Sequence, residues 1–198
     1  MKLLLQGLWM VVSGLLALTG PANAQQPVKD AEQRVEVSFS DGHETDRRDH
    51  GRPVVLIAGA LGVSPDVFRK AFSNVTPAPA GREPDPDQVR RNKDALLRAL
   101  GPYGITNARL DRVSDYYRYN GRNGGLWPHT PAKANATIRS GVVTGFTLTD
   151  AGSGYSSTPS VSVPGFAQLK VVVTLAYGAD FKENGSVSAI ALDSGKGK

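Results

Sequence analysis

The spacing of apolar residues along the chain changes from an alternating pattern to a helical one and back again. Residues 34–42 (RVEVSFSDG) alternate, with Val35, Val37 and Phe39 on one side, which predicts a strand that ends in an Asp-Gly turn. From residue 137 onward the residues again alternate and many are β-branched. Between these regions apolar residues recur at intervals of three and four, which is typical of helices that bury one face.

Helix-end signals divide this middle region into short helices. Ser, Asp and Thr are good N-terminal caps, and proline is well suited to the first helical position. The expected helices therefore begin at Pro53, Ser64, Asp85 and either Thr106 or Asn107. The third is expected to bury a stripe formed by Val89, Leu96, Leu97 and Leu100.

The pattern predicts an α+β protein: a helical unit of about four short helices, followed by a small and mainly antiparallel β unit. Segment 120–136 is rich in Gly, Asn and Pro, which predicts a linker or ordered loop in which Trp127 packs on something. The expected divisions are a signal peptide at 1–24, a strand and charged loop at 25–52, the helical unit at 53–119, the linker at 120–136 and a β repeat unit at 137–198.

The β unit contains an internal repeat. Residues 141–155 (GVVTGFTLTDAGSGY) match residues 185–198 (GSVSAIALDSGKGK), and each copy predicts a strand followed by a G-x-G turn. Gly152 and Gly154 permit the positive φ of such a turn, Tyr155 would cover it, and Pro159 would open the next strand at a sheet edge. We therefore expect these residues to be structural.

The stretch VTGFTLTDAGSGYSSTPSVSV resembles G-S-G-Y β repeat units of secreted bacterial surface proteins and phage tail-fibre-like proteins. The resemblance covers roughly residues 140–198, and the second copy lacks the Tyr that follows the turn in the first. It implies a scaffold role for the β unit. The chain as a whole is also similar to exported bacterial proteins with a helical N-terminal part, a resemblance that implies no activity.

The N-terminal residues and the composition indicate export. Lys2, an apolar stretch from Leu8 to Leu18 and the Ala22-Asn23-Ala24 sequence form the three regions of a signal peptide, with cleavage expected after Ala24. We expect a secreted, periplasmic or cell-surface protein, and not an integral membrane protein. The chain has no cysteine, which excludes disulfides, thiolate metal ligands and thiol nucleophiles.

One loop could supply metal ligands. His43, Asp46, Asp49 and His50 lie within eight residues, and His129 is the remaining histidine of the sequence. Their spacing matches no metalloenzyme signature. The alternative is a charged loop in which Arg47 and Arg48 pair with the two aspartates, or in which Asp49 caps the helix beginning at Pro53. We expect no tight metal site and no cofactor.

Two other arrangements suggest binding. Tyr116, Tyr119 and Trp127 are candidates for stacking on a sugar or peptide, with arginines nearby; the alternative is that they cover the core. Residues 55–72 have the pattern of a helix-turn-helix motif: an apolar helix, a short turn and a second helix. Such a motif would contact nucleic acid through Arg69, Lys70, Arg90 and Arg91. Asp66 would face the phosphates in such a complex, and export removes the protein from the chromosome, so we do not expect a nucleic-acid partner.

The sequence therefore favours an exported scaffold or binding module of the envelope, surface or extracellular space, without enzymatic activity. Its candidate partners are a cell-surface glycan or another envelope protein. Two alternatives stay open: a metal-dependent hydrolase built on the His43–His50 loop, and a helix-turn-helix-like nucleic-acid binder. The hydrolase would require His129 close to that loop and a pocket beside it.

Overall fold

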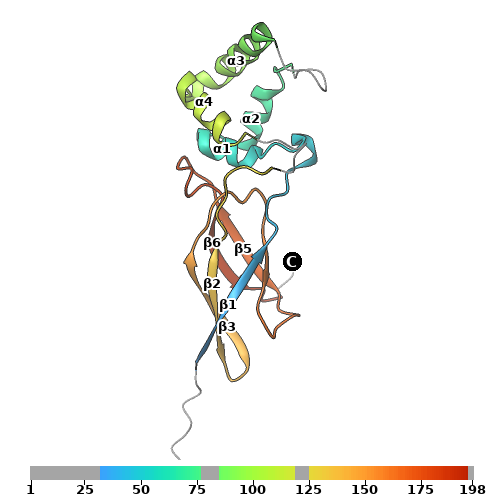
Figure 1. Cartoon of the computed structure of the whole chain (residues 1–198), viewed down its shortest axis with the longest axis vertical. Helices are drawn as coiled ribbons and strands as arrows, with labels where there is room; N and C mark the ends of the chain where they lie inside the picture. Colours follow the sequence, from blue (N-terminus) through green and yellow to red (C-terminus); the bar gives the residue numbers. More distant parts are fainter. Residues whose placement is uncertain (1–31, 77–84, 119–124, 196–198) are drawn as a thin grey trace, which may run out of the picture. The chain divides into compact units, whose positions relative to one another are not determined.

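The structure is a computed structural model that describes residues 32–76, 85–118 and 125–195 (Figure 1). The helices precede most of the strands and the strands pair antiparallel, so the expected α+β class is confirmed. The helices are α1 (Val54–Leu61), α2 (Pro65–Phe72), α3 (Pro86–Leu100) and α4 (Asn107–Tyr116). The strands are β1 (Gln33–Ser40), β2 (Lys133–Arg139), β3 (Val142–Asp150), β4 (Ser160–Ser162), β5 (Val171–Ala176) and β6 (Ser186–Leu192).

Three helices begin at the capping residues expected from the sequence. The side chains of Ser64, Asp85 and Thr106 each accept a hydrogen bond from a main-chain N–H of the first turn that follows. Helix α1 differs, because Pro53 stands just before it and no side chain caps it. The sequence-based expectation that Asp49 caps this helix is therefore wrong, and Asp49 belongs instead to a 3-10 helix, Arg47–Asp49.

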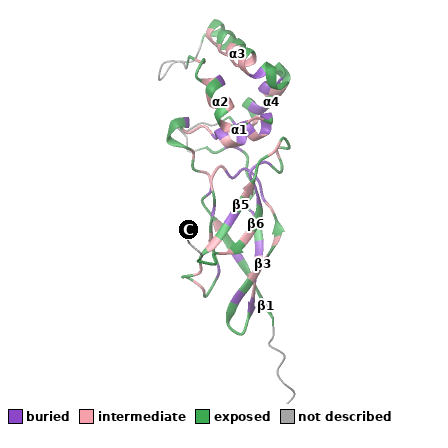
Figure 2. Cartoon of the chain, turned by 180° about the vertical axis from the view of Figure 1, so that it is seen from behind, coloured by how far each residue is buried: buried purple, intermediate pink, exposed green. Residues whose placement is uncertain are grey.

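The helical core is built around α1, whose residues are mostly buried (Figure 2). Leu56 is fully enclosed, and Leu100 and Val113 pack into the same cluster from α3 and α4. Val89 does not join them, because it is 48% exposed near the start of α3. The apolar stripe of α3 thus becomes buried only toward its C-terminal end. Among the described residues, no helix is both long enough and apolar enough to cross a bilayer.

Strand β1 lies inside a four-stranded sheet of order β3-β2-β1-β4. It pairs with β2, where Val37 is opposite Ala134, and with β4, where Phe39 is opposite Val161. The sheet therefore includes residues that the sequence pattern assigned to a separate N-terminal segment. Strand β2 also begins at Lys133, inside the segment expected to be a linker.

Strands β5 and β6 form a second sheet of two strands. A shared apolar cluster connects the two sheets: Val173 and Val187 pack with Tyr155 and Ala132, and Phe39 and Leu148 lie against the same cluster. Val187 is 1% exposed, so it lies at the centre of this cluster. The β region is thus two layers around a small core.

The hairpins β2–β3 and β5–β6 contain the same irregularity at matching positions. Thr144 is the extra residue of a β-bulge in β3, and Ser188 is the extra residue of one in β6. The Thr144 hydroxyl donates to the carbonyl of Thr137 at 3.2 Å, and the Ser188 hydroxyl donates to the carbonyl of Thr174 at 3.1 Å. The two bulges are separated by the 44 residues that separate the matching sequences.

The helices and strands lie within one compact unit, Ala31–Lys198. Arg109 of α4 donates to the carbonyl of Ala60 in α1 at 3.1 Å, and to that of Ala179 in the β5–β6 connection at 2.6 Å. Asn184, in the same connection, is fully buried and bonds to both α1 and Tyr117. Helices α1 to α4 lie between β1 and β2 in the sequence and form a helical insertion, which these bonds fix to the strand region.

Candidate ligand-binding site

Two cavities meet at Arg52, beside the N-terminal end of α1. One has a volume of about 310 Å³ and the other about 570 Å³. Their linings share His50, Arg52, Phe68 and Phe72, so the two cavities adjoin. Volumes of this order are typical of small-molecule sites. The smaller cavity continues between the helices, where its apolar lining consists of Ile57, Phe68, Phe72, Leu96 and Leu110.

Arg52 lies over the ring of Phe72, with the guanidinium carbon 4.0 Å from the ring centroid. One of its nitrogens donates to the main-chain carbonyl of Asp49 at 3.1 Å. Burial lowers the pKa of Arg52, and the Asp49 carboxylate opposes that shift. The guanidinium nevertheless keeps its charge, because an arginine side chain is not deprotonated in proteins. The stacking on Phe72 holds this half-buried cation between the two cavities.

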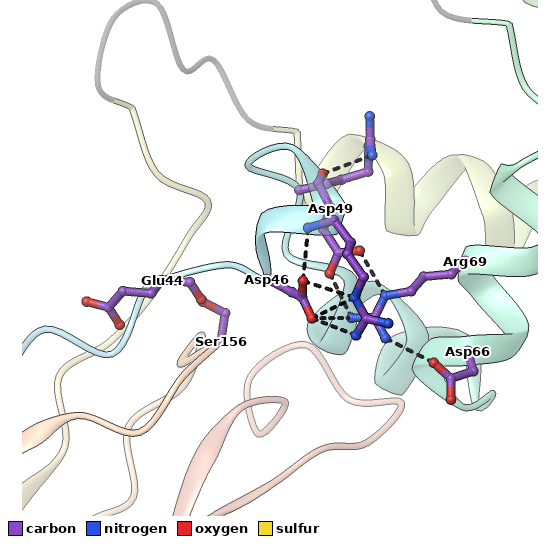
Figure 3. A network of polar contacts seen from close by, with 8 residues as sticks. Glu44, Asp46, Asp49, Asp66, Arg69 and Ser156 are labelled. Atoms are coloured by element: carbon purple, nitrogen blue, oxygen red, sulfur yellow. Dashed lines mark hydrogen bonds and ion pairs between the residues drawn. The ribbon is translucent and has the colours of Figure 1, made fainter.

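Every other arginine that lines these cavities is paired with a carboxylate. Arg69 forms a two-pronged ion pair with Asp49 at 2.8 and 2.9 Å, and it also bonds Asp66 (Figure 3). Asp49 is 4% exposed, so this pair is largely shielded from water. The hydrogen bonds to Asp49 raise the pKa of Arg69.

The two remaining lining arginines, Arg48 and Arg118, have exposed partners. Arg48 pairs with Asp46 at 2.7 Å and Arg118 with Asp115 at 2.6 Å. The hydrogen bonds from Arg48 lower the pKa of the Asp46 carboxyl. Arg52, in contrast, has no carboxylate of the described residues within ion-pairing distance. The site therefore contains one half-buried cation with unused donors next to apolar walls.

The five residues considered as metal ligands do not all lie together. His43 and His129 approach each other, with ring centroids 4.5 Å apart. Asp46 and Asp49 are instead bonded to arginines, and His50 is exposed with a left-handed backbone (φ 50°) at the end of the 3-10 helix. In the part of the chain that the structure describes, no three His, Asp or Glu side chains are placed to share a metal ion.

The His43 ring occupies an aromatic cluster under the G-x-G turn. It stacks on Tyr155 with ring centroids 5.4 Å apart and planes at 29°, and it lies 6.2 Å from the ring of Trp127. Its Nε2 atom is enclosed and has no hydrogen-bond partner in the described part of the chain. Burial is the main cause that lowers the pKa of His43, and His129 lowers it further. None of the cavities described above is lined by these two histidines.

The aromatic candidates for ligand stacking have internal partners. Tyr116 stacks on Phe181 with centroids 4.4 Å apart and planes at 14°. Trp127 is 2% exposed, and its Nε1 donates to the carbonyl of Gly154 at 2.7 Å. Its ring therefore has no open face for a sugar or peptide. Tyr119 lies outside the described residues.

Other residues of the protein pack closely against the DAGSGYSSTP turn (residues 150–159). Gly152 and Gly154 have φ of 61° and 83°. A Cβ atom on Gly154 would stand 2.8 Å from the carbonyl oxygen of Pro128, and one on Gly152 would stand 2.5 Å from that of Thr130. The Tyr155 hydroxyl accepts a hydrogen bond from the N–H of Ala132 at 2.9 Å. Pro159 directly precedes β4, which is an edge strand of its sheet.

Some of the basic side chains that would contact nucleic acid in the helix-turn-helix interpretation are already paired with carboxylates of the protein. Helices α1 and α2 do form a packed pair, but Arg69 is bonded to Asp49 and Asp66, and Arg90 pairs with Asp87. The carboxylates already offset the positive charge that would attract a phosphate to these two arginines. Among the described residues, Arg69 and Arg90 are therefore not unpaired cations, whereas Lys70 and Arg91 form none of the ion pairs found.

Sequence reasoning did not identify Arg52 as a site residue. The residue before a proline at the start of an apolar helix is usually assigned to the preceding loop, and Phe72 fits an ordinary core stripe. The available signal was an arginine two residues before a helix that itself carries no charge. Comparisons of the chain with known protein families, with curated proteins and with solved structures gave no match.

Proposed function

We propose that the protein is an exported, non-enzymatic binding module in which the strands form a scaffold and the helical insertion contains the ligand site. The observation that carries this proposal is the position of Arg52, a half-buried cation without a carboxylate partner in the described chain, between two adjoining cavities. Binding sites for small molecules typically combine apolar walls with a small number of placed polar groups.

The β region supports a scaffold role because its distinctive residues are used internally. The G-x-G turn packs against residues 128–132, and Tyr155 is buried. The matching bulges at Thr144 and Ser188 support the interpretation of the two hairpins as copies of one repeat unit. Such a unit is stabilised by its own turn and bulge geometry. The sequence of the helical insertion can therefore change without disturbing the strands that support it.

Export forms part of the same proposal. The order of a basic residue, an apolar stretch and the Ala22-Asn23-Ala24 sequence is typical of a cleaved signal peptide. N-terminal sequencing of the protein from its own cells should begin at Gln25. Recovery of a chain that still begins at Met1 from the cytosol would contradict this part of the proposal.

The binding function can be tested with a neutral apolar fluorophore, N-phenylnaphthylamine. Its emission should rise on addition of the mature protein, because the walls of the smaller cavity are apolar. Ser114 is an exposed residue of α4 that lines this cavity, so Ser114→Trp should fill the cavity and suppress the increase. Ala108→Trp is the matched control, on the same helix and outside the lining of both cavities. Equal emission in both variants, or no emission increase at all, would refute the proposal.

A further inference from the structure

The chemistry around Arg52 limits the class of ligand that the cavities can bind, and the ligand assignment rests on the function proposed above. We infer that the two cavities bind a free, single-chain apolar carboxylate, with its head group on the Arg52 guanidinium and its tail among the apolar side chains between the helices. The head and the tail are supported by separate observations.

The head-group assignment follows from the unused donors of Arg52. A guanidinium has five N–H donors, and Arg52 directs one nitrogen to the Asp49 carbonyl. Its planar fork matches the two oxygens of a carboxylate, and stacking on Phe72 fixes the plane of that fork. The carboxylate of Asp49, which lines the larger cavity with Arg52, is held by Arg69 at 2.8 Å and does not compete for this position.

The charge balance of the lining also favours an anion. Arg48, Arg69 and Arg118 are each paired with an aspartate, so Arg52 is the one arginine of the lining without a carboxylate partner among the described residues. A cationic ligand would bring a further positive charge beside a half-buried arginine, and like charges at close range are unfavourable. A neutral apolar ligand would leave the donors of Arg52 partly desolvated and unbonded.

The tail assignment follows from the smaller cavity. Its lining extends from Arg52 past Phe68 and Phe72 to Ile57, Leu96 and Leu110, which supply aliphatic and aromatic surface. A volume of about 310 Å³ is at the lower end of ligand sites, which suits one short chain better than a two-chain lipid. Each methylene group buried on these walls should strengthen binding about fourfold.

Calorimetric titration of the mature protein tests the inference directly, with decanoate, decanol and decyltrimethylammonium as probes near neutral pH. Decanoate should bind about tenfold more tightly than decanol, because it adds charge-assisted hydrogen bonds, and the cationic probe should bind most weakly. Octanoate should bind more weakly than decanoate by about fourfold for each methylene removed. Equal affinities for decanoate and decanol would overturn the inference and leave the proposed binding function intact if the neutral fluorophore still binds.

Two arginine variants assign the head group. Arg52→Gln should remove the preference for decanoate over decanol while decanol binding changes little, and Arg52→Lys should restore part of it. Arg47→Gln is the matched control, because Arg47 is an exposed arginine of the 3-10 helix outside both linings. A preference that persists in Arg52→Gln, or that disappears equally in Arg47→Gln, would overturn the assignment. Arg52-dependent sedimentation with phosphatidylglycerol vesicles, without binding of free decanoate, would overturn it in favour of a membrane surface.

Discussion

The side-chain amide of Asn184 donates a hydrogen bond to the main-chain carbonyl of Leu56 over 2.7 Å, and so connects the β5–β6 hairpin to α1. The same nitrogen donates to the Tyr117 hydroxyl at 2.7 Å, and the Asn184 side-chain oxygen accepts from the N–H of Gly178 at 3.1 Å. Asn184 is completely buried. Burial raises the pKa of Tyr117 to about 12, an effect that the bond to Asn184 partly offsets. One amide thus holds together segments that lie far apart in the sequence.

Replacing Asn184 by alanine should destabilise the whole described fold. The substitution removes these partners from the buried Leu56 carbonyl and the partly buried Gly178 N–H, which should lower the free energy of unfolding by about 2–4 kcal/mol. Urea denaturation followed by circular dichroism measures the change. The control is Asn107→Ala at the exposed start of α4, which should alter stability by less than about 0.5 kcal/mol. Comparable losses in both variants would show that the buried amide has no special role.

A comparison of Gly154 with Gly165 separates two reasons why Gly154 must be a glycine: its backbone conformation and the lack of space for a side chain. Both have positive φ, 83° and 82°, but a Cβ on Gly165 would meet no atom within 4 Å. Gly165→Ala should therefore cost about 1 kcal/mol, which is the usual cost of the backbone conformation alone. Gly154→Ala should cost about 2–4 kcal/mol, because its Cβ would also stand 2.8 Å from the Pro128 carbonyl oxygen. Equal shifts in melting temperature would mean that residues 128–129 move away without cost.

The helix caps and the G-x-G turn could be predicted because both are determined by neighbouring residues. Ser64 and Asp85 accept bonds from N–H groups three residues ahead, and Gly154 has a conformation that only a few residue types adopt readily. The position of β1 could not be predicted in this way. Its alternating pattern requires a partner strand but does not specify which one, and its partners β2 and β4 follow the helical insertion.

The candidate site was harder to predict from the sequence than the fold, because it depends on more contacts between residues far apart in the chain. The dense charges of residues 43–50 suggested metal ligands, but Asp49 is bonded by Arg69, which is twenty residues further along the chain. Once that pair forms, Arg52 is the one arginine lining the two cavities that has no carboxylate partner among the described residues. The spacing of residues in the sequence does not show with which of several arginines Asp49 pairs, because the pairing depends on how α2 packs against the 3-10 helix.

The Asp49–Arg69 pair should contribute measurably to stability, in contrast to an exposed pair nearby. Asp49→Asn removes the charge from a carboxylate that is 4% exposed and leaves Arg69 with weaker partners, so unfolding should become easier by about 2–3 kcal/mol. Asp46→Asn is the matched control, because the Asp46–Arg48 pair lies at the surface and should contribute little. Chemical denaturation in low and high salt distinguishes the two, since added salt screens the exposed pair more strongly. A larger loss in Asp46→Asn would contradict this assignment.

His43 should make the stability of the protein depend on pH in the weakly acidic range. Burial lowers the pKa of His43 in the folded state below its unfolded value of about 6.5, so protons bind preferentially to the unfolded chain. The stabilising effect of a neutral His43 is therefore complete above about pH 6.5 and is lost as the pH falls toward the lowered folded pKa. The other titratable groups that act on this ring are His129, Glu44 and Asp41. The measurement is the free energy of unfolding as a function of pH.

The contribution of His43 to that pH dependence is isolated by His43→Phe, which keeps a flat ring beside Tyr155 and removes the proton-binding site. The enclosed Nε2 atom has no hydrogen-bond partner among the described residues, so replacing it with carbon should cost little at neutral pH. The variant should then lose less stability than the parent protein between neutral and weakly acidic pH. His50→Gln is the control, because His50 is exposed and outside this aromatic cluster, and it should retain the parent's slope. An unchanged slope in His43→Phe would mean that groups other than His43 bind the additional protons on unfolding.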